Sequence, residues 1–153
     1  MGDSVRKPDP SPLDIAAKVL ARGPRTEAEL AARLERIGYS AAKVTATVAR
    51  CRELRYVDDA AVAMDRARTL RARGAGSLRI ATELEARGVP DVLVSAALDE
   101  SLGGESEVHW AERALERQRI DVRDPGARAR AWRLLASRGF PEDVITDVVP
   151  DWD

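Results

Sequence analysis

The strongest constraint on the fold of this chain is a sequence phrase that recurs three times. The three copies are "IGYSAAKVTATV" at 37–48, "RGVPDVLVSAAL" at 87–98 and "RGFPEDVITDVV" at 138–149. Aligned on their glycines, Gly38, Gly88 and Gly139, the copies lie 50 and 51 residues apart. A leucine stands four residues before each glycine, and aliphatic residues stand six and ten residues after it. A register shared at a fixed period predicts an array of structural repeats.

Each of the three glycines is predicted to end one helix and to form the corner that leads to the next. Glycine adopts positive φ at little cost at the C-terminal end of a helix. Arg87 and Arg138 precede two of the glycines, where a cation favours the end of a helix. Ser40, Pro90 and Pro141 lie where the following helix would begin. Each repeat therefore contains two helices joined through a tight corner.

A third helix is expected upstream of each pair, at about 13–22, 58–73 and 105–119. Thr26 and Glu29 have the spacing of a capping box at the start of the first middle helix. The predicted fold class is all-α, with nine helices in three tandem three-helix repeats that form an elongated, curved array. The expected divisions are a flexible N-terminal segment at 1–12 and repeats at 13–57, 58–103 and 104–153.

Composition agrees with a helical fold and excludes several classes of site. Hydrophobic residues make up 44% of the chain but aromatic residues only 4%, so the core must be built from aliphatic side chains. The one cysteine, Cys51, excludes an internal disulfide and is expected to be buried. The segment "MGDSVRKPDPSP" has no apolar run that would serve as a secretory signal, so we expect a cytoplasmic protein.

The sequence offers no constellation of residues that would support catalysis. His109 is the single histidine, so neither a catalytic triad nor a zinc set is expected. The turn "GAGSLR" lacks the preceding strand that dinucleotide binding needs. Tyr56 is expected to fill a corner and Asp58 to cap a helix. The tryptophans, expected in the core or at a partner contact, are Trp110, Trp132 and Trp152. We expect no enzyme, no cofactor and no metal.

Charge is distributed unevenly although the net charge is only −1. The segment 13–57 carries nine basic and five acidic residues, 58–103 carries six and eight, and 104–153 carries eight and eleven. A slightly acidic chain is not expected to hold naked nucleic acid tightly by charge alone. The basic first repeat and the more acidic later repeats could instead face partners of opposite charge.

The segment from Tyr56 to Gly88 resembles the central part of RecX regulatory proteins. The matching features, in order, are Tyr56-Val57-Asp58-Asp59, Arg66 and Arg68, Arg73-Gly74-Ala75-Gly76, Arg79-Ile80, Glu83-Leu84 and Gly88. The stretches "LARGPRTEAELAARLERIGY" and "LLASRGFPEDVI" are similar to the family's first and last units, so the resemblance covers about 13–149. The chain departs from the family in carrying Val62 where phenylalanine is usual, and in having few lysines.

This resemblance implies a non-catalytic regulator of RecA, the recombinase that polymerises on single-stranded DNA. It implies binding to the RecA nucleoprotein filament, weak direct binding of single-stranded DNA, and inhibition of recombinase, ATPase and coprotease activities. We also expect a monomer with no membrane partner. Two alternatives stay open from the residues: a helix-turn-helix DNA-binding regulator, because three-helix units with tight turns resemble such modules, and a general helical protein-interaction module.

Two groups of arginines are the candidate contacts with the RecA filament and its DNA. The first group has no acidic residue within its span and consists of Arg66, Arg68, Arg71, Arg73 and Arg79. Positions 66 and 68 point about 200° apart on a helix, so this group cannot share one face. We expect Arg68 and Arg73 to contribute to inhibition. The second group lies around the first turn and comprises Arg25 and Arg33, with Arg22 and Arg36 beside them.

Overall fold

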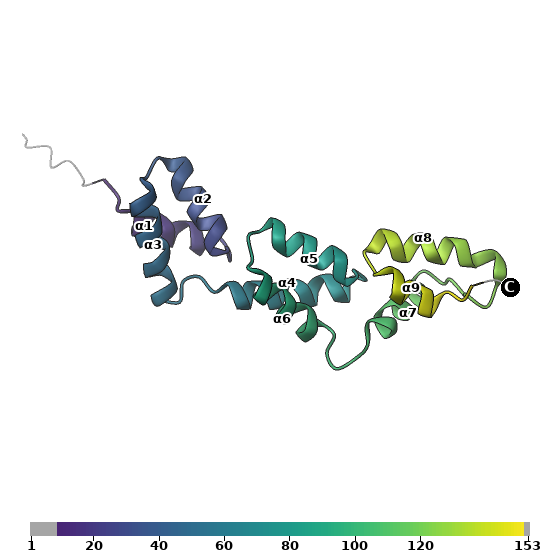
Figure 1. The fold of residues 1–153 in the computed structure, drawn as a ribbon. Helices are drawn as coiled ribbons and strands as arrows, with labels where there is room; N and C mark the ends of the chain where they lie inside the picture. Colours follow the sequence, from purple (N-terminus) through teal and green to yellow (C-terminus); the bar gives the residue numbers. More distant parts are fainter. Residues whose placement is uncertain (1–8, 152–153) are drawn as a thin grey trace, which may run out of the picture. The chain divides into compact units, whose positions relative to one another are not determined.

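The computed structural model describes residues 9–151. All the regular secondary structure in that range is helical (Figure 1). The helices are α1 (Pro12–Ala21), α2 (Glu27–Ile37), α3 (Ala41–Glu53), α4 (Asp59–Ala72), α5 (Ser77–Ala86), α6 (Asp91–Ser101), α7 (Glu107–Arg117), the 3₁₀ turn η1 (Pro125–Ala127), α8 (Arg128–Arg138) and α9 (Glu142–Val148). The predicted all-α class and three-helix organisation are confirmed. Residues 1–8, which hold most of the segment expected to be flexible, and Trp152 lie outside the described residues. Among the described helices, none is long and apolar enough to cross a membrane.

The three repeat glycines form the same corner three times, as the sequence predicts. Their φ angles are +111° at Gly38, +78° at Gly88 and +88° at Gly139. In each corner the N–H after the glycine donates to the carbonyl of the leucine five residues earlier, at 3.3 Å for Leu34 and 3.1 Å for Leu84 and Leu135. These bonds satisfy carbonyl groups that a helix end would otherwise leave without a partner.

Local capping signals fix where several helices begin. Thr26 and Glu29 form the predicted capping box at the start of α2, with the Thr26 N–H donating to Glu29 at 3.0 Å and the Glu29 N–H donating to Thr26 at 3.1 Å. The hydroxyl of Ser40 accepts from the N–H of Lys43 and caps α3. Helix α4 begins at Asp59, directly after Asp58, whose role as a cap stays a prediction. Each cap of this kind is worth about 1 kcal/mol of stability.

Each helix trio encloses its own hydrophobic core. The buried residues of the three cores fall within 16–57, 63–97 and 111–149. The leucines that mark the repeat, Leu34, Leu84 and Leu135, are each 0% exposed, as is Cys51 in the first core. The chain divides into two compact units, Met1–Asp59 and Ala60–Asp153. The repeat boundaries 13–57, 58–103 and 104–153 remain a prediction.

Backbone contacts hold the second and third trios together within one unit. The N–H of Gly76 donates to the carbonyl of Arg138 at 2.8 Å, and the N–H of Leu78 donates to the carbonyl of Gly139 at 2.9 Å. A Cβ atom added to Gly76 would lie only 2.5 Å from the Gly139 carbonyl oxygen. The start of α5 therefore rests directly on the corner between α8 and α9, and this close approach requires glycine at position 76.

We expect Gly76→Ala to lower the free energy of unfolding by at least about 2 kcal/mol, because the added methyl group meets backbone atoms that have no room to move. Gly126→Ala is the matched control. Its φ is not positive and its nearest neighbour would be a side-chain oxygen of Asp124 at 3.4 Å. Urea unfolding of both variants measures the difference, and equal midpoints for the two would contradict this account of the joint.

Candidate functional site

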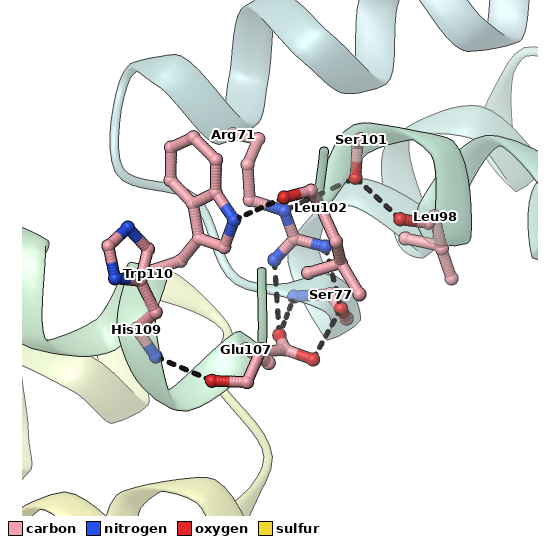
Figure 2. A network of polar contacts seen from close by, with 9 residues as sticks. Arg71, Ser77, Leu98, Ser101, Leu102, Glu107, His109 and Trp110 are labelled. Atoms are coloured by element: carbon pink, nitrogen blue, oxygen red, sulfur yellow. Dashed lines mark hydrogen bonds and ion pairs between the residues drawn. The ribbon is translucent and has the colours of Figure 1, made fainter. Parts of the chain in front are cut away.

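Arg71, one of the candidate contact residues, is buried inside the unit formed by the second and third trios (Figure 2). Its side chain is 1% exposed. The guanidinium donates from Nε to Ser101 at 3.2 Å, from Nη1 to Glu107 at 3.2 Å and from Nη2 to Ser77 at 2.9 Å. These partners lie on α6, α7 and α5, so one side chain of α4 connects to three other helices.

Two of the residues that accept from Arg71, Ser77 and Glu107, also form hydrogen bonds with each other. Glu107 accepts from the N–H of Ser77 at 2.7 Å and from the Ser77 hydroxyl at 2.7 Å. Burial lowers the pKa of Arg71, and the charge and hydrogen bond of Glu107 act in the opposite direction. A buried cation of this kind is tolerated because its donors and its charge are matched. Arg71 is therefore a structural residue, and its side chain is not available for the partner contact expected from the sequence.

The other arginines of the first group divide into paired and unpaired residues. Arg66 is bonded to Glu83 at 2.6 Å, and Arg68 is bonded to Glu100 at 2.7 Å. Arg73 and Arg79 are exposed and form no ion pair with any described residue. Only these two arginines of the group present a guanidinium that a partner could contact without displacing an acidic neighbour.

The second group of arginines lines a hollow on the first unit. We call it the α1–α2 groove; it has a volume of about 600 Å³ and is lined by Ile15, Lys18, Val19, Arg22, Arg25, Glu29, Ala32, Arg33, Arg36 and Ile37. Arg25 and Arg33, predicted from the sequence, both lie in it together with Arg22 and Arg36. Lys18 was missed, although its position four residues before Arg22 on one helix places the two on the same face.

A carboxylate at the start of one trio caps the middle helix of the preceding trio, and this feature was not predicted. The first residue of α4, Asp59, accepts from the N–H of Glu27, the first residue of α2, at 2.8 Å. Glu107, the first residue of α7, accepts from the N–H of Ser77, the first residue of α5, in the same way. An acidic residue at this position in successive repeats is the sequence signal that could have revealed it.

Burial raises the pKa of Asp59, and the hydrogen bond from the Glu27 N–H acts in the opposite direction. The residue Asp59 is 8% exposed, and burial disfavours the charged form of its carboxyl group. Arg52 does not bond Asp59 directly. It donates from Nε to the Glu27 carboxylate at 2.8 Å on the same side of the first unit. Within the first unit, Asp59 therefore contacts the start of α2 as a hydrogen-bond acceptor.

Other residues considered in the sequence have structural environments. Burial raises the pKa of Cys51, which keeps its thiol protonated. Tyr56 does not fill a corner as expected, since it is 51% exposed and Val57, 4% exposed, occupies the core instead. Trp110 donates to the carbonyl of Leu102 at 3.0 Å and packs against the third core. Trp132 packs against the same core, so the core role expected for these two tryptophans is confirmed.

The chain is similar to proteins of one family over most of its length. The model described as RecX, first three-helix domain, matches residues 13–51, and the model described as RecX, second three-helix domain, matches residues 58–98. The regulatory protein RecX of Geobacillus kaustophilus is 36% identical over 136 residues, which cover 86% of this chain and 50% of that protein. The regulatory protein RecX of Chromohalobacter salexigens is 35% identical over 139 residues, which cover 88% of each chain.

Two solved structures share the fold. The crystal structure of RecX from Lactobacillus salivarius has a TM-score of 0.71 and 19% sequence identity, covering 90% of this chain and 92% of that one. A crystal structure of regulatory protein RecX has a TM-score of 0.72 and 22% identity, covering 92% of this chain and 74% of that one. The chain spans about half of the Geobacillus protein and more than four fifths of the Chromohalobacter protein.

We expect Arg71→Ala to destabilise the protein by about 3 kcal/mol, because it leaves the Glu107 carboxylate with an unmatched charge in a largely buried site. Arg73→Ala removes the same side chain from an exposed position two residues away and should change stability by less than about 0.5 kcal/mol. Chemical denaturation of the two variants makes the comparison. A small effect of Arg71→Ala would show that the buried network does not stabilise the unit.

Asp59→Asn should stabilise the protein at neutral pH, because the amide oxygen still accepts from Glu27 and no charge is buried. The raised pKa means that Asp59 favours the folded state below its unfolded pKa and loses that contribution as pH rises through its folded pKa. The stability advantage of the variant should thus shrink between about pH 7 and about pH 4. Unfolding titrations at both pH values test this, and an advantage that is independent of pH would refute it.

Proposed function

The chain belongs to the RecX family, and we propose that it binds the RecA–single-stranded DNA filament and inhibits its recombinase, ATPase and coprotease activities. The observation that carries the proposal is the match of both three-helix domains to this family, whose curated relatives are named regulatory proteins. RecA acts on DNA in the bacterial cytoplasm, which is where we place this chain.

Regulation by binding is supported by how the polar side chains are used. In the part of the chain that the structure describes, no buried side-chain nitrogen or oxygen lacks a hydrogen-bond partner. The buried polar cluster around Arg71 holds helices together. The exposed cations, in contrast, are available to a negatively charged partner.

The proposed contact residues lie on both compact units. Arg73 and Arg79 belong to the second unit, and Arg25 and Arg33 belong to the first. A filament presents the same protein and DNA surfaces repeatedly, so contacts from two units of one chain raise the effective concentration of each for the other. Weak individual contacts can then give stable binding, which suits a slightly acidic protein whose attraction to naked DNA is limited.

A helix-turn-helix regulator is the weaker candidate because of what the third helix of the second trio exposes. In the second trio, α6 presents the acidic residues Asp91, Asp99 and Glu100 to solvent, together with Val92 at 78% exposure. Carboxylates on a recognition helix would repel the phosphates that flank a major groove. A general protein-interaction module would use the same exposed surface. Titration into a RecA ATPase reaction separates such a module from a RecA regulator.

The proposal is tested by titrating the protein into a RecA ATPase reaction on single-stranded DNA. We expect ATP hydrolysis to fall as the protein approaches RecA in concentration. Co-sedimentation with the assembled filament should show binding over the same range. An unchanged ATPase rate at stoichiometric protein, without co-sedimentation, would overturn the proposed function.

Charge reversal at the two unpaired arginines identifies the contact surface on the second unit. Arg73→Glu with Arg79→Glu should raise the concentration for half-inhibition on the order of tenfold, which corresponds to about 1.4 kcal/mol. Arg68 is a poorer target, because reversing its charge would place two carboxylates against each other at Glu100. The matched control is Arg130→Glu with Arg133→Glu on α8, an exposed pair in the same unit. Equal potency of the two double variants would remove Arg73 and Arg79 from the interface.

A further inference from the structure

We propose that the corner at the end of α3, formed by Arg55 and Tyr56, docks on the protein component of the filament, where it takes up an apolar side chain and an adjacent carboxylate. The proposal rests on the proposed function and deepens it, by naming the component of the filament that one surface contacts. Both residues, and the hollow beside them, lie in the first compact unit.

The α3 corner has the backbone geometry of the repeat corners but lacks their glycine. The N–H of Arg55 donates to the carbonyl of Arg52 at 3.0 Å, and the N–H of Tyr56 donates to the carbonyl of Cys51 at 2.8 Å. The φ angle of Arg55 is +58°, in the left-handed region that favours glycine. The same pair of backbone bonds ends other helices of the chain, at Gly38, Gly74, Gly88, Arg119 and Gly139.

The residue that follows Arg55 also departs from the pattern of these corners. A helix end of this type is commonly accompanied by a hydrophobic contact from the residue after the left-handed position. At the other corners that residue is buried or half-buried, as seen for Tyr39, Ala75, Val89, Ile120 and Phe140. Tyr56 is instead 51% exposed. The α3 corner is therefore the one of this group that combines a left-handed arginine with an exposed aromatic residue.

Packing and ion pairing within the described fold do not account for Arg55. Its side chain is exposed and forms no ion pair with any described residue. Two arginines just before it on α3 are paired, Arg50 with Glu53 and Arg52 with Glu27. Left-handed backbone costs arginine more than it costs glycine. An unpaired arginine held in this conformation at an exposed corner indicates that its guanidinium serves a contact outside the chain.

A hollow beside Tyr56 supplies the apolar half of the docking surface. It has a volume of about 270 Å³ and is lined by Ala17, Leu20, Ala21 and Tyr56. These lining residues carry no charge, so the hollow suits an apolar side chain. Tyrosine and arginine are the residue types that contribute most to protein–protein interfaces, and arginine binds a carboxylate through two parallel hydrogen bonds.

The surroundings of Arg55 favour a protein partner over a nucleic acid. Glu53 and Asp58 are exposed on either side of it in the sequence. Carboxylates close to a single cation oppose the approach of phosphates, whose binding depends on an excess of positive charge. A protein surface that presents one carboxylate beside an apolar side chain meets no such opposition.

The test measures the fluorescence anisotropy of the full chain, labelled with fluorescein at its N-terminus, on RecA filaments assembled on oligothymidylate. Tyr56→Ala should weaken binding to the filament about tenfold, as expected for an interface anchor. Arg55→Gly should weaken binding about fivefold. It should also raise the urea midpoint of unfolding, because glycine relieves the left-handed backbone. A loss of binding by Arg55→Gly is thus separated from a loss of folding.

Arg119→Gly is the matched control, because Arg119 is the other exposed arginine with positive φ, at +55°. This variant should likewise raise the urea midpoint, but it should bind the filament as the unmodified chain does. Tyr56→Phe keeps the aromatic ring and should also retain binding. A loss with Tyr56→Phe as large as with Tyr56→Ala would contradict an apolar anchor.

Three further results would overturn the proposal. The first is filament binding by Tyr56→Ala and Arg55→Gly equal to that of the unmodified chain. The second is an equal loss of binding with Arg119→Gly. The third is a matching loss of binding to oligothymidylate without RecA, which would assign the corner to DNA. Inhibition of the RecA ATPase by the unmodified chain is measured alongside. Inhibition that persists while the variants bind normally removes the docking corner and leaves the proposed function intact, whereas an unmodified chain that does not bind the filament refutes both.

Discussion

The buried ion pair between Arg71 and Glu107 is the interaction on which the organisation of the larger unit depends. A guanidinium that is 1% exposed can remain charged only if its donors and its charge are matched. Ser77, Ser101 and Glu107 supply these matches from three different helices, and any shift of one trio against the other would leave part of the network without a partner. The network therefore specifies one arrangement of the second and third trios.

Backbone contacts and a capping carboxylate also fix how the second and third trios pack together. Gly76 allows the start of α5 to touch the corner at Gly139, so N–H groups at the start of the helix donate to carbonyls of the neighbouring trio. Glu107 belongs to both systems, since it neutralises Arg71 and also accepts from the first N–H of α5. Several charged residues of the second unit, among them Arg66, Arg68 and Arg71, are therefore already paired within the fold. Arg73 and Arg79, which form no ion pair with a described residue, are the cations of the second unit that we propose contact the RecA filament.

Much of the fold could be predicted because the rules that fix it act over a few residues. The corners at Gly38, Gly88 and Gly139 follow from the cheapness of positive φ at glycine, and the start of α2 follows from the side chains of Thr26 and Glu29. The site was harder to predict. Arg25 and Arg33 were identified from local clustering and do share a groove, but Arg71 looked equivalent to Arg73 in the sequence although one is buried and the other exposed.

The sequence by itself determined the helical class, the repeat period and the corner geometry, because these depend on side chains and dihedral angles within one or two helical turns. Only the tertiary structure decided which arginines are structural and which are free. Arg71 finds Glu107 across 36 residues and Ser101 across 30, and Asp59 reaches back 32 residues to cap α2. A charge is neutralised by whatever neighbour lies within a few ångströms, and distance along the chain carries little information about that neighbour.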